Sequence, residues 1–190
     1  MNLENMFSQT KLNSILYTDP FLKAGFIAKV VQNAKIDVLY LDFDLLYSGY
    51  LASEMLIAPQ TLSLFQPTIE IWNQTLTSIL VKLSMKKSLV IVDSLNGLFN
   101  MLNERKEIGK LVTSYIMMLQ SMAQITNSYV LVASMVRFKK KEGWVLTPTG
   151  KRFLDTNKAK KILLKQKEGG IVLDFLNKEK IFIPANSIPL

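Results

Sequence analysis

The chain has 190 residues, of which 49% are hydrophobic, and a formal net charge of +8. This length allows one domain that buries roughly 70% of its unfolded surface, and the apolar content excludes a disordered chain. The absence of cysteine and histidine excludes disulfides, zinc sites and catalysis by Ser-His or Cys-His pairs.

Signals for export or membrane insertion are absent from the sequence. Residues 1–5 carry no basic segment that leads into an apolar one, and no apolar run approaches the ~20 residues of a membrane helix. We therefore expect a cytoplasmic protein of one domain. Its parts would be an N-terminal extension (1–11), a parallel α/β core (12–159) and a C-terminal β meander (160–190).

Strands and helices are expected to alternate through the first 85 residues. Asp19 and Pro20 predict a helix start, because Asp caps helix N-termini and Pro suits the first helical position. Apolar residues at helical spacing from Ile69 predict a second long helix. The elements predicted here are strands at 12–17, 36–41 and 61–65 and helices at 19–33, 47–57 and 69–85.

The most informative stretch, residues 87–99, contains an apolar run that ends at Asp93. Such a run predicts a buried parallel strand, which delivers its acid to the carboxyl edge of the sheet, where α/β proteins bind ligands. Asp93 would either help to hold Mg²⁺, as an Asp in this position does in P-loop NTPases, or cap the following helix. Ser94 and Asn96 are further candidates for capping that helix.

The second half continues the alternation and then changes character. A helix at 108–125 leads into a strand at 128–134, and such crossovers predict a mostly parallel sheet. Short β-like runs at 162–165, 171–176 and 180–183 follow, separated by turn residues such as Gly169-Gly170. They predict a small antiparallel meander at the sheet edge.

The positive charge is concentrated in one segment. Residues 1–136 carry 10 basic and 10 acidic residues, residues 137–167 carry 11 and 2 (net +9), and residues 168–190 carry 2 and 3. A block of one sign is typical of a surface that binds a polyanion. The alternative is a solubilising face.

The order of these elements resembles the ATPase core of RecA/RadA-type recombinases. The resemblance rests on residues 89–95, the helices that follow, residues 129–135, and a basic loop that contains Pro148-Thr149-Gly150. It covers roughly residues 12–183 and is most specific from 88 to 152. It implies a RecA-like P-loop NTPase core, an α/β fold with a mostly parallel central sheet flanked by helices, with the small antiparallel meander at its C-terminus.

The nucleotide machinery of that family is degraded here. A P-loop has the pattern G-x-x-x-x-G-K-[S/T], but this chain has Thr18-Asp19-Pro20-Phe21-Leu22-Lys23-Ala24-Gly25. Lys23 stands where the motif lysine would, whereas Ala24 has no hydroxyl and both motif glycines are missing. Asp19 would repel phosphate, and Pro20 has no N–H to offer it.

Two further family positions have changed. Asp44 matches the catalytic Glu, and Met135 stands in the place of a polar pair that couples nucleotide state to DNA. Of this set only Asp93 survives. The resemblance therefore implies a pseudo-ATPase whose degenerate nucleotide site consists of Lys23, Asp44, Asp93 and Met135, with no catalytic residue, cofactor or metal.

The resemblance also implies that a loop after the 128–134 strand contacts single-stranded DNA. In that segment cations alternate with aromatic residues, as in grooves that bind the backbone and stack bases. The candidate contacts are Arg137, Lys139, Lys140, Lys141, Trp144, Lys151, Arg152, Lys158 and Lys160. We expect Trp144 to be exposed and Phe153 to be packed in the core. Lysines 158–167 would extend the surface or protect a sheet edge.

Three hypotheses follow. The first is a non-catalytic recombinase paralog that binds nucleic acid, most simply single-stranded DNA, through residues 137–167. It would assist recombination or repair, paired with an active recombinase or with itself. The alternatives are a RecA-fold scaffold subunit of an RNA-binding, Elongator-like assembly, and an active ATPase with an aberrant P-loop.

Overall fold

The structure is a computed structural model that describes residues 3–103, 106–147, 159–176 and 179–189. Its helices are α1 (Leu3–Met6), α2 (Pro20–Asn33), α3 (Leu46–Ala52), α4 (Trp72–Met85), α5 (Leu95–Met101), α6 (Ile108–Ile125) and the 3-10 turn η1 (Ala185–Ser187). Its strands are β1 (Leu12–Tyr17), β2 (Asp37–Asp42), β3 (Leu62–Phe65), β4 (Ser88–Asp93), β5 (Tyr129–Lys139), β6 (Gly143–Leu146), β7 (Ala159–Lys167), β8 (Gly170–Asp174) and β9 (Lys180–Pro184).

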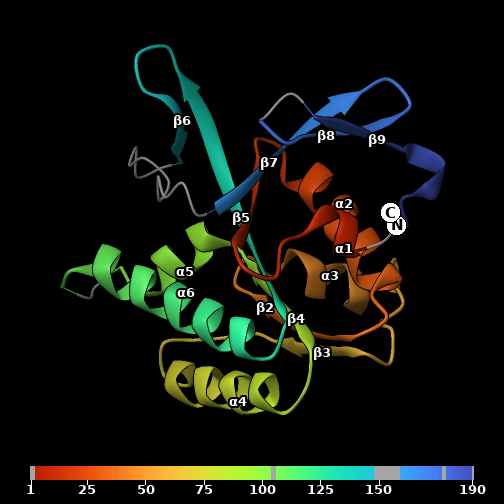
Figure 1. Cartoon of the computed structure of the whole chain (residues 1–190). Helices are drawn as coiled ribbons and strands as arrows, with labels where there is room; N and C mark the ends of the chain where they lie inside the picture. The colour runs from red at the N-terminus through yellow and green to blue at the C-terminus, as the bar shows by residue number, and fades with distance from the viewer. Residues whose placement is uncertain (1–2, 104–105, 148–158, 177–178, 190) are drawn as a thin grey trace.

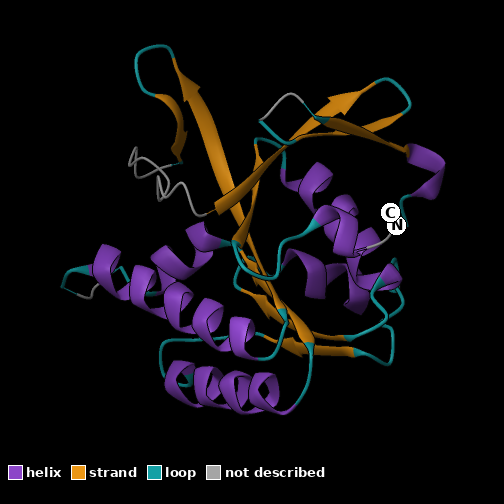
Figure 2. Cartoon of the chain, viewed as in Figure 1, coloured by secondary structure: helices purple, strands orange, loops and turns teal. Residues whose placement is uncertain are grey.

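The described strands form a single sheet in the order β3-β2-β4-β5-β1-β7-β8-β9, with β6 paired to β5 (Figure 2). The pairs from β3 to β7 are parallel, and β7-β8 and β8-β9 are antiparallel. The predicted α/β fold with a mostly parallel sheet and a C-terminal antiparallel meander is confirmed. The strand that carries Asp93 lies inside the sheet, between β2 and β5.

Helices cover both faces of the sheet, as apolar parallel strands require. α2 and α3 lie on one face and α4, α5 and α6 on the other (Figure 1). Each face has its own core of buried side chains, one built around Phe26, Ile27 and Val30 of α2 and the other around Leu76, Ile116 and Leu119 of α4 and α6. No described helix is long and apolar enough to cross a membrane.

Two predicted helix boundaries were wrong. The helix predicted at 47–57 ends at Ala52, because Glu54 adopts a left-handed backbone with φ of 61° that breaks the helical path. The helix predicted from Ile69 begins at Trp72, after a short turn. Start and end of α2 agree with the prediction, since Asp19 caps it and Pro20 occupies its first position.

Beyond the end of β1 the sheet divides into two arms. β1 stops at Tyr17, level with Met135 of β5, while the neighbouring strands β5 and β7 continue. β5 turns back through β6 to form the hairpin arm (residues 136–146), and β7 turns back through β8 and β9 to form the meander arm (residues 164–176 and 179–184). Figure 1 shows the two arms diverging at the top of the molecule.

Candidate functional site

The carboxyl ends of the parallel strands bring the predicted nucleotide-site residues to one edge of the sheet. α2 begins directly after β1 at this edge, and its first turn carries Lys23. Asp44 follows β2, Asp93 ends β4, and Met135 lies in β5 next to Tyr17 of β1. Since the carboxyl edge is where ligands bind in open α/β sheets, this is the place to test for a nucleotide site.

The N-terminus of α2 is closed by a side chain of the chain itself. The Asp19 carboxylate accepts hydrogen bonds from the Phe21 N–H at 2.8 Å and the Leu22 N–H at 3.3 Å. These amides are the groups that a helix N-terminus offers to a phosphate. The Asp19 carboxylate therefore already occupies these amides.

Lys23 is fully buried and paired with the carboxylate at the end of β4. Its Nζ lies 2.6 Å from Asp93 Oδ1 and 3.5 Å from Asp44 Oδ2. The ring of Tyr17 lies 5.3 Å from the same ammonium. With two carboxylates close by, the ammonium is already neutralised and buried.

The second oxygen of Asp93 is also occupied. It accepts a hydrogen bond from the Tyr40 hydroxyl at 2.6 Å, so each oxygen of this buried carboxylate has a partner. Burial raises the pKa of Asp93, and the Lys23 ammonium and the Tyr40 hydroxyl act in the opposite direction. Among the described residues, no group of three or more acidic, His or Cys side chains is placed to hold a metal ion.

Asp93 is not the cap of the following helix. The N-cap of α5 is Ser94, whose Oγ accepts from the Gly97 N–H at 3.2 Å and donates to Asp44 Oδ1 at 3.0 Å. Ser94 is therefore the capping residue, as predicted. The alternative prediction, that Asp93 caps this helix, was wrong, because its carboxylate accepts hydrogen bonds from Lys23 and Tyr40.

Asn96 has a role that the sequence did not indicate. Instead of capping α5, its side chain accepts from the Met135 N–H at 2.7 Å and donates to the Thr147 carbonyl. It thereby ties α5 to the end of the parallel part of β5 and to the residue after β6. No local sequence signal identifies such a bridge, because its partners lie 39 and 51 residues away.

The predicted DNA-contacting loop is a β-hairpin over residues 137–146. β5 was predicted to end at 134 but continues to Lys139, and the register pairs Phe138 with Trp144 and Lys139 with Gly143. Backbone pairing with β6 extends the strand, and the positive φ of Gly143 (73°) forms the turn. The basic side chains thus stand on a regular scaffold.

The hairpin presents cations and one exposed aromatic ring. Arg137, Lys140 and Lys141 are exposed, and Lys139 pairs with Glu142 at 3.1 Å. Phe138 is 63% exposed and meets Trp144 edge to face, with 5.4 Å between ring centroids. The expectation of an exposed Trp144 was wrong: this ring is half-buried against the core, and Phe138 is the open ring.

The other predicted contacts are not brought to the hairpin arm. Lys160 of β7 lies opposite Asn13 of β1, and Asn13 lies opposite Leu131 of β5. Lys160 is therefore level with Leu131, six residues before Arg137, and not with the hairpin arm. Its Nζ lies 5.0 Å from the Phe175 ring. Lys151, Arg152 and Lys158 lie outside the described residues, as do Phe153 and part of the mixed-charge segment 103–106.

The arrangement of the whole chain matches a known fold. The crystal structure of the RadB recombinase superposes on it with a TM-score of 0.62 and a sequence identity of 16%, over 95% of this chain and 90% of that one. The chain has a RecA-like fold. No family model and no curated protein matches the sequence.

Proposed function

We propose that this chain is a non-catalytic RecA-fold recombinase paralog that binds single-stranded nucleic acid, most simply DNA, and assists recombination or repair. The likeness to a recombinase structure supports a recombinase-related role at the level of the fold. Its partner would be an active recombinase or a second copy of this chain.

The absence of ATP hydrolysis is supported by the ion pair at the sheet edge. Hydrolysis needs a free ammonium for the phosphates and a free carboxylate for Mg²⁺. Here the buried Lys23 and Asp93 neutralise each other at 2.6 Å, and Asp19 occupies the helix amides. A nucleotide would have to break both arrangements, so it has no ready binding site.

The hairpin arm is the observation that carries nucleic-acid binding. It carries Arg137, Lys140, Lys141 and the exposed ring of Phe138 on a scaffold of paired strands. Cations along a backbone path and an open aromatic face are what single-strand binding requires, and each stacked base contributes about 1–3 kcal/mol.

The test is charge reversal on the arm. The triple variant Lys139→Glu, Lys140→Glu and Lys141→Glu should abolish binding of a labelled oligonucleotide at low salt, measured by fluorescence anisotropy. The melting temperature should change little, because two of the three side chains are exposed and the Lys139–Glu142 pair is a surface pair.

The matched control reverses Lys35, Lys82 and Lys110, which carry the same total charge and are exposed after the end of α2, on α4 and on α6, respectively. This control should keep binding. Equal loss in both variants would mean that net charge alone is responsible, and absence of binding by the unmodified protein would refute the proposal. Preference for tRNA would favour the scaffold hypothesis, and saturable binding of Mg-ATP would favour the aberrant ATPase.

A further inference from the structure

The outer face of the meander arm combines lysines with an exposed aromatic ring. Strand alternation turns one set of side chains inward, and Leu164, Ile171, Leu173 and Ile183 are buried in the core. The side chains on the opposite face include Lys165, Lys167, Val172, Asp174, Lys180 and Phe182.

Phe182 lies open at the edge strand of the sheet. It is 48% exposed, and its ring rests against the turn at Gly169-Gly170. A Cβ on Gly170 would clash with the Ile183 carbonyl oxygen and lie 3.0 Å from the Phe182 ring, so it is chiefly the close backbone of β9 that requires a glycine here. The Lys167 ammonium lies 6.0 Å from the ring centroid.

The lysines around this ring differ in whether they form an ion pair. Lys165 pairs with Asp174 at 2.7 Å and holds β7 to β8. Lys167 and Lys180 are exposed on either side of Phe182; Lys167 adjoins the acidic Glu168 of the turn, and Lys180 lies opposite Asp174 in the register of β8 and β9. An aromatic ring between two exposed cations repeats the chemistry of the hairpin arm.

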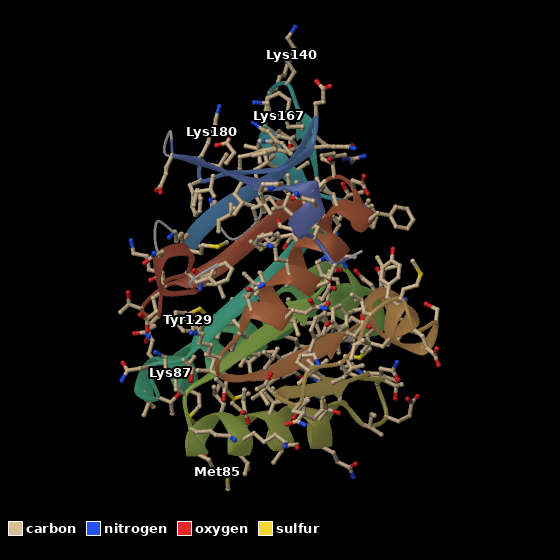
Figure 3. The ribbon with its side chains drawn as sticks, turned by 90° about the vertical axis from the view of Figure 1, so that its right-hand side faces the viewer. Met85, Lys87, Tyr129, Lys140, Lys167 and Lys180 are labelled. Atoms are coloured by element: carbon tan, nitrogen blue, oxygen red, sulfur yellow. The ribbon has the colours of Figure 1, made fainter. Side chains whose placement is uncertain are left out.

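The two arms also present this chemistry on the same face of the sheet. One row of paired residues crosses β5, β1, β7, β8 and β9, and its members are Ser134, Leu16, Leu163, Asp174 and Lys180. Side chains two or four residues along a strand lie on the same face of the sheet. Phe138 is four residues from Ser134, Lys167 is four from Leu163 and Phe182 is two from Lys180, so all three lie on the face of this row. Lys140, Lys167 and Lys180 lie at one end of the molecule, opposite Met85 (Figure 3).

We propose that the meander arm is a second contact surface for the same single strand, with Phe182 as a base-stacking platform and Lys167 and Lys180 as phosphate contacts. This inference rests on the proposed function. A strand held by the hairpin arm would continue past the end of β1 to the meander arm. The ligand is recognised by stacking and charge, which fit single-stranded DNA and RNA alike.

The experiment measures binding of two single-stranded oligonucleotides, of about 6 and about 20 nucleotides, which bracket common site sizes. Phe182→Ala should weaken binding of the long strand by roughly 5- to 150-fold, the loss expected for one stacked base. Lys167→Glu should weaken it as well and lower its salt dependence. Binding of the short strand, which the hairpin arm alone can hold, should be unchanged in both variants.

The controls are Met85→Ala and Lys82→Glu, which change an exposed apolar residue and an exposed lysine on α4, far from both arms. Phe182→Leu keeps apolar volume at the edge strand, and a melting temperature equal to that of the unmodified protein verifies that it folds. This variant should also lose affinity for the long strand.

The outcomes separate this inference from the proposed function. If the unmodified protein binds neither oligonucleotide, the proposed function fails and the inference with it. If the protein binds, but Phe182→Ala and Lys167→Glu bind the long strand as tightly as it does, only the second surface is refuted. A loss with Lys167→Glu alone would refute the stacking platform.

Discussion

At the residue scale, the decisive feature is the charge balance around Lys23. A buried ammonium is costly unless carboxylates compensate it, and here Asp93 and Asp44 do so. The three side chains come from α2, the end of β4 and the loop after β2. Their interaction therefore joins three elements at the carboxyl edge of the sheet.

Removing one partner of this pair should destabilise the protein strongly. In Lys23→Met the buried Asp93 loses its closest cation, and we expect the free energy of unfolding to fall by about 3–5 kcal/mol, measured by urea denaturation. The double variant Lys23→Met and Asp93→Asn should recover part of this loss because no buried charge remains unpaired. Lys87→Met, which breaks the surface pair with Glu4, is the control and should cost less than about 1 kcal/mol. Similar losses for Lys23→Met and Lys87→Met would contradict the importance of the buried pair.

A second residue, Asp42, should make stability depend on pH. Its Oδ2 accepts from the Ser48 N–H at 2.7 Å, while its buried Oδ1 has no hydrogen-bond partner in the described part of the chain. Burial raises the pKa of Asp42 above its ordinary value of 3.8, although the Ser48 hydrogen bond lowers it.

The folded chain thus holds the Asp42 proton more tightly than the unfolded chain does. The stabilisation from this proton is complete below the unfolded pKa and is lost as pH rises through the higher folded pKa. The free energy of unfolding of the unmodified protein relative to Asp42→Asn should therefore fall as the pH rises above the ordinary carboxyl pKa of 3.8. Glu54→Gln, at an exposed carboxylate, is the control, and a difference that is flat or rises with pH would contradict this sign.

At the scale of elements, the position of α5 depends on a close approach to the loop after β2. A Cβ at Gly97 would lie 2.6 Å from both Asp44 Oδ1 and Phe43 Cβ. The helix that starts at Ser94 can therefore approach Asp44 only because residue 97 has no side chain. The same position of α5 places the Asn96 side chain at the base of the hairpin arm, where it accepts from the Met135 N–H.

Two glycine substitutions should have opposite effects for this reason. Gly97→Ala should lower the free energy of unfolding by about 1–3 kcal/mol through overpacking. Gly49→Ala, within α3 and with no atom within 4 Å of its Cβ, should raise it by roughly 0.5–1 kcal/mol because alanine favours helix. Thermal unfolding of both variants measures the contrast, and stabilisation by Gly97→Ala would show that α5 is not so closely seated.

At the scale of the whole molecule, the closed edge and the open arms predict opposite responses to two ligands. A ligand present at 100 times its Kd adds about 2.7 kcal/mol of stability, which would raise the Tm of a chain of this size by roughly 5–11 °C. Mg-ATP at millimolar concentration should leave the Tm unchanged, whereas a single-stranded oligonucleotide at low salt should raise it. A rise of several degrees with Mg-ATP would revive the aberrant ATPase.

Much of the parallel core followed from local patterns. The apolar run before Asp93, the Asp19-Pro20 helix start and the periodicity of α6 each depend on neighbours in sequence, so they predicted their elements correctly. The hairpin arm could not be predicted from local patterns, because β5 extends past residue 134 only by pairing with β6. Trp144 was misjudged for a related reason, since packing against the core decides its exposure.

The sequence by itself determined the α/β class, the order of strands and helices, the absence of the P-loop pattern and the location of the positive charge. These are local properties of composition and periodicity. Only the tertiary structure decided that Lys23 is neutralised by Asp93, 70 residues away, and that the sheet splits into two arms that share one face. Such relations depend on which strands are neighbours and where β1 stops, and no stretch of sequence contains that information.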